Sequence, residues 1–145
     1  MEVNRKALLI GTGTAAAALI GAKLRNHGAN LAGRVVLITG GSRGLGLAMA
    51  RQFAAEGCRI AVCARNEAGL RAVRQDPELA GIVTTFQCDV TRKDQVEKMV
   101  REAIAHFGHI DILVNNAGEI QAGPVQSMTV SDFESAMNVM FWGVV

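Results

Sequence analysis

Short apolar runs and longer segments with helical spacing alternate between residues 34 and 145. The apolar runs are typical of strands and lie at Val35–Ile38, Arg59–Ala64, within Gly81–Cys88, and at Asp111–Asn115. Continuous runs of this kind, bounded by glycine or polar residues, favour strands that are buried on both faces. Strands that alternate with helices predict an α/β fold with a parallel sheet.

The first two helices are predicted on either side of the second strand. After a glycine-rich turn, four apolar residues fall on one helical face: Leu45, Ala48, Met49 and Phe53. Gly57 is placed to end this helix. A second helix is expected over Asn66–Gln75, before Asp76–Pro77, because a residue that precedes proline disfavours the helical conformation.

Two further helices are expected in the second half of the chain. Thr91 and Asp94 fit a capping box, and the helix should end at Gly108 with one apolar side made of Val96, Met99, Val100, Ala103 and Phe107. Thr129 and Asp132 fit a second capping box. We expect that helix to continue to Val145 with a buried stripe of Phe133, Ala136, Met137, Met140 and Val144.

The turn after the first strand has the composition of a phosphate-binding loop. Its glycines follow Thr39 in the spacing Gly40-x-x-x-Gly44-x-Gly46. Glycine permits positive φ and a close approach of the backbone to a ligand, and the amino end of the next helix attracts negative charge. We therefore expect the backbone amides between Thr39 and Gly46 to bind a pyrophosphate, although an ordinary strand-to-helix turn is the alternative.

Two motifs resemble those of the short-chain dehydrogenase/reductase family: TGGSRGLG at Thr39–Gly46 and NNAG at 115–118. The resemblance extends from about Gly33 to the last residue. It implies a Rossmann-like, doubly wound parallel sheet with strand order 3-2-1-4, of which this chain holds a part, and a nicotinamide dinucleotide at the carboxyl ends of the strands. The cofactor-binding residues that it implies are Gly40, Ser42, Arg43, Gly44, Leu45, Gly46, Arg65, Asp89, Val90, Asn116, Ala117 and Gly118.

The end of the second strand favours NADP(H) over NAD(H). A carboxylate about 20 residues after the glycine turn would bind the ribose 2′-hydroxyl of NAD, and neither Asp nor Glu occurs in Val62–Asn66. Arg65 stands there instead, and Arg43 lies within the turn. Two guanidinium groups can bind a 2′-phosphate, unless both are solvated surface charges.

The catalytic residues of the family are absent from this chain. The resemblance implies a Tyr, a Lys four residues later and an upstream Ser, but the sequence contains no tyrosine. The family also has an Asn three residues before a glycine, in the motif NxxG. If Gly143 is that glycine, Met140 stands at the Asn position, and we do not assign the role of this Asn to Asn138. We therefore assign no catalytic residue and expect the 145 residues alone to be inactive.

We therefore interpret the chain as the N-terminal portion of an NADP(H)-dependent oxidoreductase that transfers hydride between nicotinamide and an alcohol or carbonyl. The alternatives are a non-catalytic NADP(H)-binding module such as a redox sensor, a membrane-tethered interaction protein, and a truncated, inactive product. A half-sheet with an exposed edge also has reason to form homo-oligomers.

Composition narrows the remaining classes of function. Fifteen basic and thirteen acidic residues give no electrostatic case for nucleic acid. Three cysteines are too few for a disulfide framework, so buried, reduced thiols and a reducing compartment are expected for Cys58, Cys63 and Cys88. His106 and His109 lack a third ligand nearby, and no metal site is predicted.

The first thirty residues form an apolar segment and a linker, separate from the nucleotide-binding domain at 31–145. Residues 7–22 carry no charge and are flanked by basic residues. A membrane anchor that holds the domain at the cytoplasmic face, a secretory signal, and a second Rossmann turn at Gly11–Ala16 compete as explanations. As a helix the segment would be about 24 Å long, short of the roughly 30 Å hydrocarbon core. Without an anchor, the domain is expected in the cytoplasm.

Overall fold

Four parallel strands form the centre of the structure, a computed structural model that describes residues 30–120 and 122–145. The strands are β1 (Val35–Thr39), β2 (Arg59–Ala64), β3 (Val83–Gln87) and β4 (Ile112–Val114). Their order in the sheet is β3-β2-β1-β4, as predicted. Strand β1 ends one residue later than expected, β3 lies within the expected segment Gly81–Cys88, and β4 is one residue shorter at each end than Asp111–Asn115. The predictions for residues 7–22 lie outside the described residues.

The central strand β1 is buried along its whole length because neighbours cover it on every side. Its residues Val35–Thr39 pair with Arg59–Cys63 of β2, and Val36–Ile38 pair with β4. The continuous apolar run that predicted this strand is therefore explained by burial on both faces.

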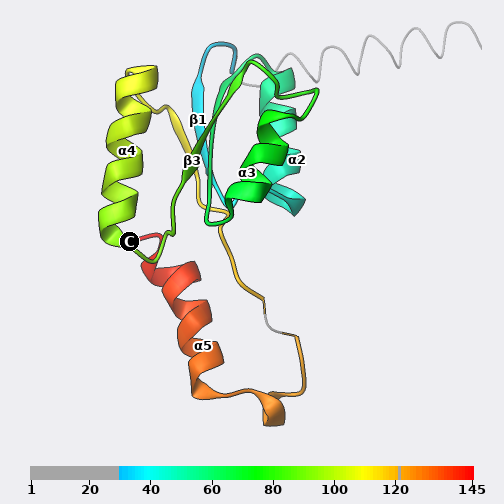
Figure 1. Cartoon of the computed structure of the whole chain (residues 1–145), viewed down its shortest axis with the longest axis vertical. Coiled ribbons are helices and arrows are strands. Elements are labelled where there is room, and N and C mark those ends of the chain that lie inside the picture. Colours follow the sequence, from blue (N-terminus) through cyan, green and yellow to red (C-terminus); the bar gives the residue numbers. More distant parts are fainter. Residues whose placement is uncertain (1–29, 121) are drawn as a thin grey trace, which may run out of the picture. The chain divides into compact units, whose positions relative to one another are not determined.

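Helices cover both faces of the sheet (Figure 1). On one face lie α2 (Gly44–Ala55) and α3 (Glu67–Arg74), and on the other lies α4 (Lys93–Phe107). One core cluster packs Val36, Ile38 and Val62 under α2 and α3, while the second packs Leu37, Cys63 and Phe86 against α4. The alternation of side chains along each strand supplies both clusters.

Helix α2 presents only part of the expected face to the sheet, since Met49 and Phe53 pack against the core whereas Leu45 and Ala48 do not. Leu45 is 70% exposed and Ala48 is also exposed, whereas Gly46 and Ala50 are buried. Gly46 faces inward because the helix starts close to the glycine turn and to the residues after β4, where a larger side chain finds no room. The predicted end of this helix is confirmed, since Gly57 follows it with φ of +81°.

The capping box predicted at Thr91 and Asp94 is wrong. Helix α4 begins at Lys93, and its N-cap residue Arg92 makes no side-chain hydrogen bond to the helix. Thr91 instead donates its amide and hydroxyl hydrogens to Asp89, at 2.9 and 2.8 Å. An aspartate two residues earlier competes for the same donors by forming a local turn.

The predicted capping box at Thr129 and Asp132 is present at the start of α5 (Val130–Met137), which follows the short 3₁₀ helix η1 (Val125–Ser127). The helix does not continue to Val145. It changes into a π-helical turn, η2 (Asn138–Trp142), whose wider repeat rotates the residues that follow.

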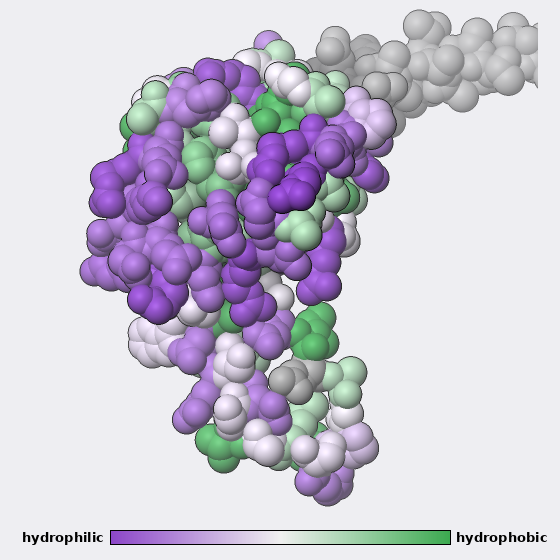
Figure 2. Space-filling view, viewed as in Figure 1, coloured by the Kyte–Doolittle hydropathy of each residue, from purple (hydrophilic) through white to green (hydrophobic). Residues whose placement is uncertain are grey.

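The buried stripe expected on this last helix is wrong for most of its members. Phe133, Met137, Met140 and Val144 are each at least half exposed, and Val139 is the buried residue. In Figure 2, apolar surface accompanies the segment after β4 in the lower part of the view. Apolar periodicity predicts that a face can be buried, but it does not supply the element that would cover it.

Candidate functional site

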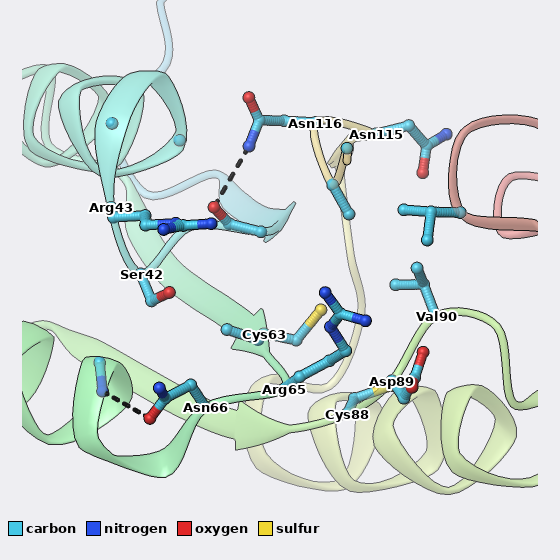
Figure 3. A pocket seen from close by; sticks show the side chains of 18 of the residues that line it. Ser42, Arg43, Cys63, Arg65, Asn66, Cys88, Asp89, Val90, Asn115 and Asn116 are labelled. Atoms are coloured by element: carbon cyan, nitrogen blue, oxygen red, sulfur yellow. Dashed lines mark hydrogen bonds between the residues drawn. The ribbon is translucent and has the colours of Figure 1, made fainter. Parts of the chain in front are cut away.

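An open cavity of about 820 Å³ lies where the carboxyl ends of the four strands meet (Figure 3). All twelve residues that the sequence singled out for cofactor binding line it, although they come from four separate segments of the chain. In open α/β sheets ligands bind at this edge, where the connections of neighbouring strands leave in opposite directions. The cavity is therefore the candidate site.

The glycine turn divides its backbone amides between the protein and the cavity. Gly40 and Gly41 donate theirs to the carbonyl oxygen of Cys63, at 2.8 and 3.3 Å. The prediction that every amide from Thr39 onward faces a ligand is therefore wrong for these two glycines. Within the described residues, the amides of residues 42–46 have no protein acceptor, so the start of α2 is the part of the turn that can bind an anion.

Glycine is required at two positions because the turn lies directly against the residues after β4. A Cβ atom on Gly40, which has φ of +67°, would lie 2.8 Å from the Cα atom of Ala117. A Cβ atom on Gly46 would lie 2.5 Å from Nδ2 of Asn116. The two sequence motifs thus fit together in space, which explains why both are needed to build one cavity wall.

Asn116 and Thr39 hold β1 and the end of β4 together. The Asn116 side chain donates to the carbonyl oxygen of Thr39 at 2.9 Å and to that of Gly40 at 3.3 Å, and Figure 3 shows the second of these bonds. In return, the buried hydroxyl oxygen of Thr39 accepts the amides of Asn116 and Ala117, each at 3.0 Å. These four bonds continue the connection between the strands beyond the last residue of β4.

Two arginines that form no salt bridge within the described residues line the cavity. Arg43 lies in the glycine turn and Arg65 follows β2, and neither forms a salt bridge within the described part of the chain. The backbone beside Arg65 is fixed, since Gln87 donates to its carbonyl oxygen at 3.1 Å and Asn66 caps the start of α3. Positive charge is thus available at the place where a dinucleotide ribose binds in related folds.

The one carboxylate among the lining residues is that of Asp89, directly after β3. Partial burial would raise its pKa, but hydrogen bonds from the amide and hydroxyl of Thr91, together with the charges of Arg65 and Arg92, lower the pKa below its usual value. Asp89 is therefore an anion that accepts hydrogen bonds. Asp89 also forms a local turn, because Thr91 occupies one of its two oxygens.

Sequence reasoning missed part of the cavity wall. Strand ends and the start of α3 also contribute Cys63, Ala64, Asn66, Gly69, Cys88 and Asn115, and the segments after β4 contribute Ile120, Val139, Met140 and Val144. The first group could have been found, since every residue at the carboxyl end of a parallel strand is a candidate. Nothing in the sequence pattern placed η2 at the cavity, and Asn138 is not among the lining residues.

The two histidines have structural partners. His106 lies 3.0 Å from the hydroxyl of Thr84, and His109 lies 3.0 Å from the carboxylate of Asp111. Among residues 30–120 and 122–145, no group of three or more His, Cys, Asp or Glu side chains could hold a metal ion. The same part of the chain contains no helix that is long and apolar enough to cross a membrane.

A comparison with protein families identifies the family to which this fold and cavity belong. The model of the short chain dehydrogenase family matches residues 34–145. The chain belongs to this family. The match covers the sheet, the glycine turn and the residues after β4, which together build the cavity, and it makes the chain a member of a family of oxidoreductases that use nicotinamide cofactors.

The relatives of this chain within the short-chain dehydrogenase family have names that state different substrates. The chain is 37% identical over 117 residues to L-fucose dehydrogenase of Oryctolagus cuniculus, covering 80% of this chain and 40% of that protein. It is 37% identical over 120 residues to 11-beta-hydroxysteroid dehydrogenase-like 2 of Arabidopsis thaliana, covering 81% of this chain and 39% of that protein. The chain thus spans about two fifths of the length of these relatives.

Solved structures of the family share the fold. A short chain dehydrogenase from Bacillus anthracis superposes with a TM-score of 0.72 at 37% identity, over 77% of this chain and 46% of that one. A 3-ketoacyl-(acyl-carrier-protein) reductase from Brucella melitensis, solved in complex with NADH, superposes with a TM-score of 0.73 at 32% identity, over 79% and 46%.

Proposed function

We propose that this chain is the NADP(H)-binding portion of an oxidoreductase that transfers hydride between nicotinamide and an alcohol or carbonyl. One observation carries the proposal: the twelve residues predicted for cofactor binding line a single cavity whose cations, Arg43 and Arg65, have no salt-bridge partner within the described residues. The free amides of residues 42–46 would bind the pyrophosphate, and Asn116, Ala117 and Gly118 would lie beside the dinucleotide.

The choice of NADP(H) follows from charge. A 2′-phosphate carries negative charge where NAD carries a neutral hydroxyl, and guanidinium groups form strong, directed hydrogen bonds to phosphate oxygens. The position after β2 that would hold a carboxylate for NAD is occupied by Arg65. Asp89 lies within electrostatic reach of Arg65, and we expect it to orient that side chain rather than to repel the phosphate.

The substrate and the catalytic step belong to the whole protein. General acid–base catalysis requires a group within hydrogen-bond reach of the reacting oxygen, and this chain has no tyrosine to serve as one in the manner of the family. We therefore propose that the 145 residues bind cofactor without turnover. A non-catalytic NADP(H)-binding module is the second candidate function, favoured by the same observation.

Titration of the purified chain with NADPH and NADH, followed by nucleotide fluorescence, tests the proposal. NADPH should bind at least about tenfold more tightly, which corresponds to about 1.4 kcal/mol. Equal affinities would contradict the role of the two arginines, and no binding of either would contradict the proposal as a whole. Turnover of a panel of aldehydes and ketones by this chain would contradict the proposed inactivity.

We propose that residues 7–22 anchor the protein at the cytoplasmic face of a membrane. We also propose that the half-sheet self-associates. Fractionation of cells that express a tagged chain, with and without residues 1–25, tests the anchor. The 145-residue chain should sediment with membranes and the shortened chain should not. Identical behaviour of the two would refute the anchor, and a monomeric mass in light scattering of the shortened chain would refute self-association.

A further inference from the structure

Gln95 connects helix α4 to the wall of the cavity, and the proposed function gives it no role. It is the third residue of α4 and is half-buried. Its side-chain oxygen Oε1 accepts the backbone amide of Asp89 at 2.9 Å. Asp89 lines the cavity, whereas Gln95 is not among the lining residues. Gln95 can therefore act on a ligand only through Asp89.

The position of Gln95 in α4 explains this contact. Side chains of a helix lean toward its amino end, and a glutamine at the third position can accept the amide of the N-cap residue. The N-cap residue here is Arg92, which makes no side-chain hydrogen bond to the helix, so no capping box forms. Gln95 instead reaches past Arg92 to the amide of Asp89.

Hydrogen bonds fix both the backbone and the side chain of Asp89. Gln95 accepts its amide, while Thr91 donates its own amide and hydroxyl to the carboxylate oxygen Oδ1, at 2.9 and 2.8 Å. The bond to Gln95 is the one that joins this turn to α4. The second carboxylate oxygen, Oδ2, forms no hydrogen bond within the described residues. One oxygen of Asp89 thus holds the turn together, and the other is available to a ligand.

The neighbours of Asp89 indicate which part of a dinucleotide it would contact. Arg65 directly follows β2, and Asp89 follows the adjacent strand β3, whose Gln87 pairs with Ala64 (Figure 3). Under the proposed function Arg65 binds the 2′-phosphate, which is attached to the ribose of adenosine, so Asp89 lies on the side of the adenine base. An ionised carboxylate only accepts hydrogen bonds, and the amino group of adenine donates them.

We infer that Gln95 is a positioning residue, which holds Asp89 in the orientation in which its carboxylate accepts the amino group of adenine. This role rests on the proposed function, because it is expressed as a difference in nucleotide affinity. Gln95 thereby contributes to the choice of base without touching the nucleotide. If the bond from the Asp89 amide is lost, that amide turns to water and the turn before α4 is no longer held to the helix.

The test compares two substitutions at Gln95. Gln95→Leu removes the acceptor at a similar side-chain size, whereas Gln95→Glu keeps a carboxylate oxygen that can accept the same amide. Each chain is titrated with NADPH and with reduced nicotinamide hypoxanthine dinucleotide phosphate, whose base carries a carbonyl oxygen in place of the amino group. The ratio of the two Kd values is the readout, because the charge that glutamate adds affects both nucleotides alike.

The expected ratios follow from the hydrogen bond to the base. The unsubstituted chain should bind NADPH at least about tenfold more tightly than the hypoxanthine analogue, since a carbonyl oxygen and a carboxylate have no proton to share. Gln95→Leu should reduce this ratio to about threefold or less, through a loss of NADPH affinity. Gln95→Glu should retain the ratio of the unsubstituted chain.

A purely structural role for Gln95 would give a different result. Destabilisation of α4 would lower the urea midpoint and weaken both nucleotides by the same factor, which leaves the ratio unchanged. Gln52→Leu is the matched control, because Gln52 is also a helical glutamine and its side chain donates to Glu56 at 3.2 Å, outside the cavity. This variant should bind both nucleotides as the unsubstituted chain does.

The positioning role is refuted if Gln95→Leu keeps the ratio of the unsubstituted chain, or if Gln95→Glu loses it to the same extent. It is also refuted if the unsubstituted chain binds both nucleotides equally well. If the unsubstituted chain binds neither, the proposed function fails, and the hold of Gln95 on Asp89 is judged by hydrogen exchange alone. The Asp89 amide should then exchange faster in Gln95→Leu, and an unchanged rate would refute the hold as well.

Discussion

Charged side chains contact partners within the protein at the amino end of the sheet, whereas at the carboxyl end they face an open cavity. At the amino end, Asp111 accepts Arg34 at 2.6 Å and the amide of Val35 at 2.8 Å, and His109 lies 3.0 Å away. Arg59, at the same end, lies over the ring of Phe107 at 4.8 Å. Each of these charged groups has a partner within the protein, and these contacts join the strands and helices of the fold.

At the carboxyl end, by contrast, Arg43 and Arg65 face an open cavity and form no salt bridge within the described residues. Within the same part of the chain, the amides of residues 42–46 also have no protein acceptor. Polar groups that a protein leaves unpaired beside a cavity are available to a ligand, whereas paired groups contribute to stability. The contrast predicts that substitutions at one end change binding and that substitutions at the other change the pH dependence of folding.

The largest effect is expected from Arg65→Asp. The substitution removes charge-assisted hydrogen bonds worth about 1.5–3 kcal/mol each and adds a repulsive charge, so NADPH affinity should fall about 100-fold. NADH should bind at least as well as before, because a carboxylate at this position can accept the ribose 2′-hydroxyl. Fluorescence titration of both nucleotides measures the change in preference.

Arg59→Asp is the control for this experiment, since it makes the same change at the other end of the same strand. It should leave both nucleotide affinities unchanged while it removes the contact with Phe107. An equal loss of NADPH affinity in the two variants would mean that net charge, and not the position of Arg65, controls binding.

Thr39→Val should produce the next largest effect, through stability. Valine has nearly the same shape but leaves the amides of Asn116 and Ala117 without the hydroxyl acceptor that holds them at 3.0 Å. A buried, unsatisfied amide costs about 1–3 kcal/mol. The urea midpoint should therefore fall, and NADPH affinity should fall with it as the residues after β4 separate from the turn.

Thr39→Ser keeps the hydroxyl group and should restore most of the stability and the nucleotide affinity. If Ser and Val at this position are equally destabilising, the lost methyl contacts, rather than the two hydrogen bonds, would account for the effect. That result would remove Thr39 from the connection between the two motifs.

The sheet was predictable because β1 to β4 carry unambiguous signals. Val35–Ile38 is apolar at every position, which fits a strand buried on both faces, and the order of strands follows from the family motifs. The twelve residues that the family resemblance implied line one cavity, as expected for glycine-rich or polar segments directly after parallel strands. These signals are local, and tertiary contacts reinforce them.

The errors arise where a neighbour decides between local alternatives. Thr91 can cap a helix or bond to Asp89, and the sequence does not rank the two. The apolar face of α5 has the period of a buried helix, but Phe133 remains 53% exposed because no described element covers it. Val139 and Met140 reach the cavity through the π-helical turn, which has no signature in the apolar spacing.

The smallest of the three effects is expected from Asp111→Asn, at the amino end. The amide of Val35 and the guanidinium of Arg34 lower the pKa of Asp111, and His109 adds to the shift. A carboxyl group whose pKa is depressed by folding stabilises the native state above its unfolded pKa of about 3.9, and this contribution is lost as the pH falls through the folded value. The unsubstituted chain should therefore lose stability below about pH 4.

In the Asn variant, this part of the acid dependence should be absent. Urea unfolding at a series of pH values should find it less stable than the unsubstituted chain at pH 7, with a difference that narrows below about pH 4. Asp94→Asn is the matched control, because Asp94 is exposed and lies 3.4 Å from Arg92. If the curves of stability against pH for Asp111→Asn and for the unsubstituted chain run parallel, the charge of this carboxylate contributes nothing to stability. NADPH affinity should be unchanged in both variants, because neither residue lines the cavity.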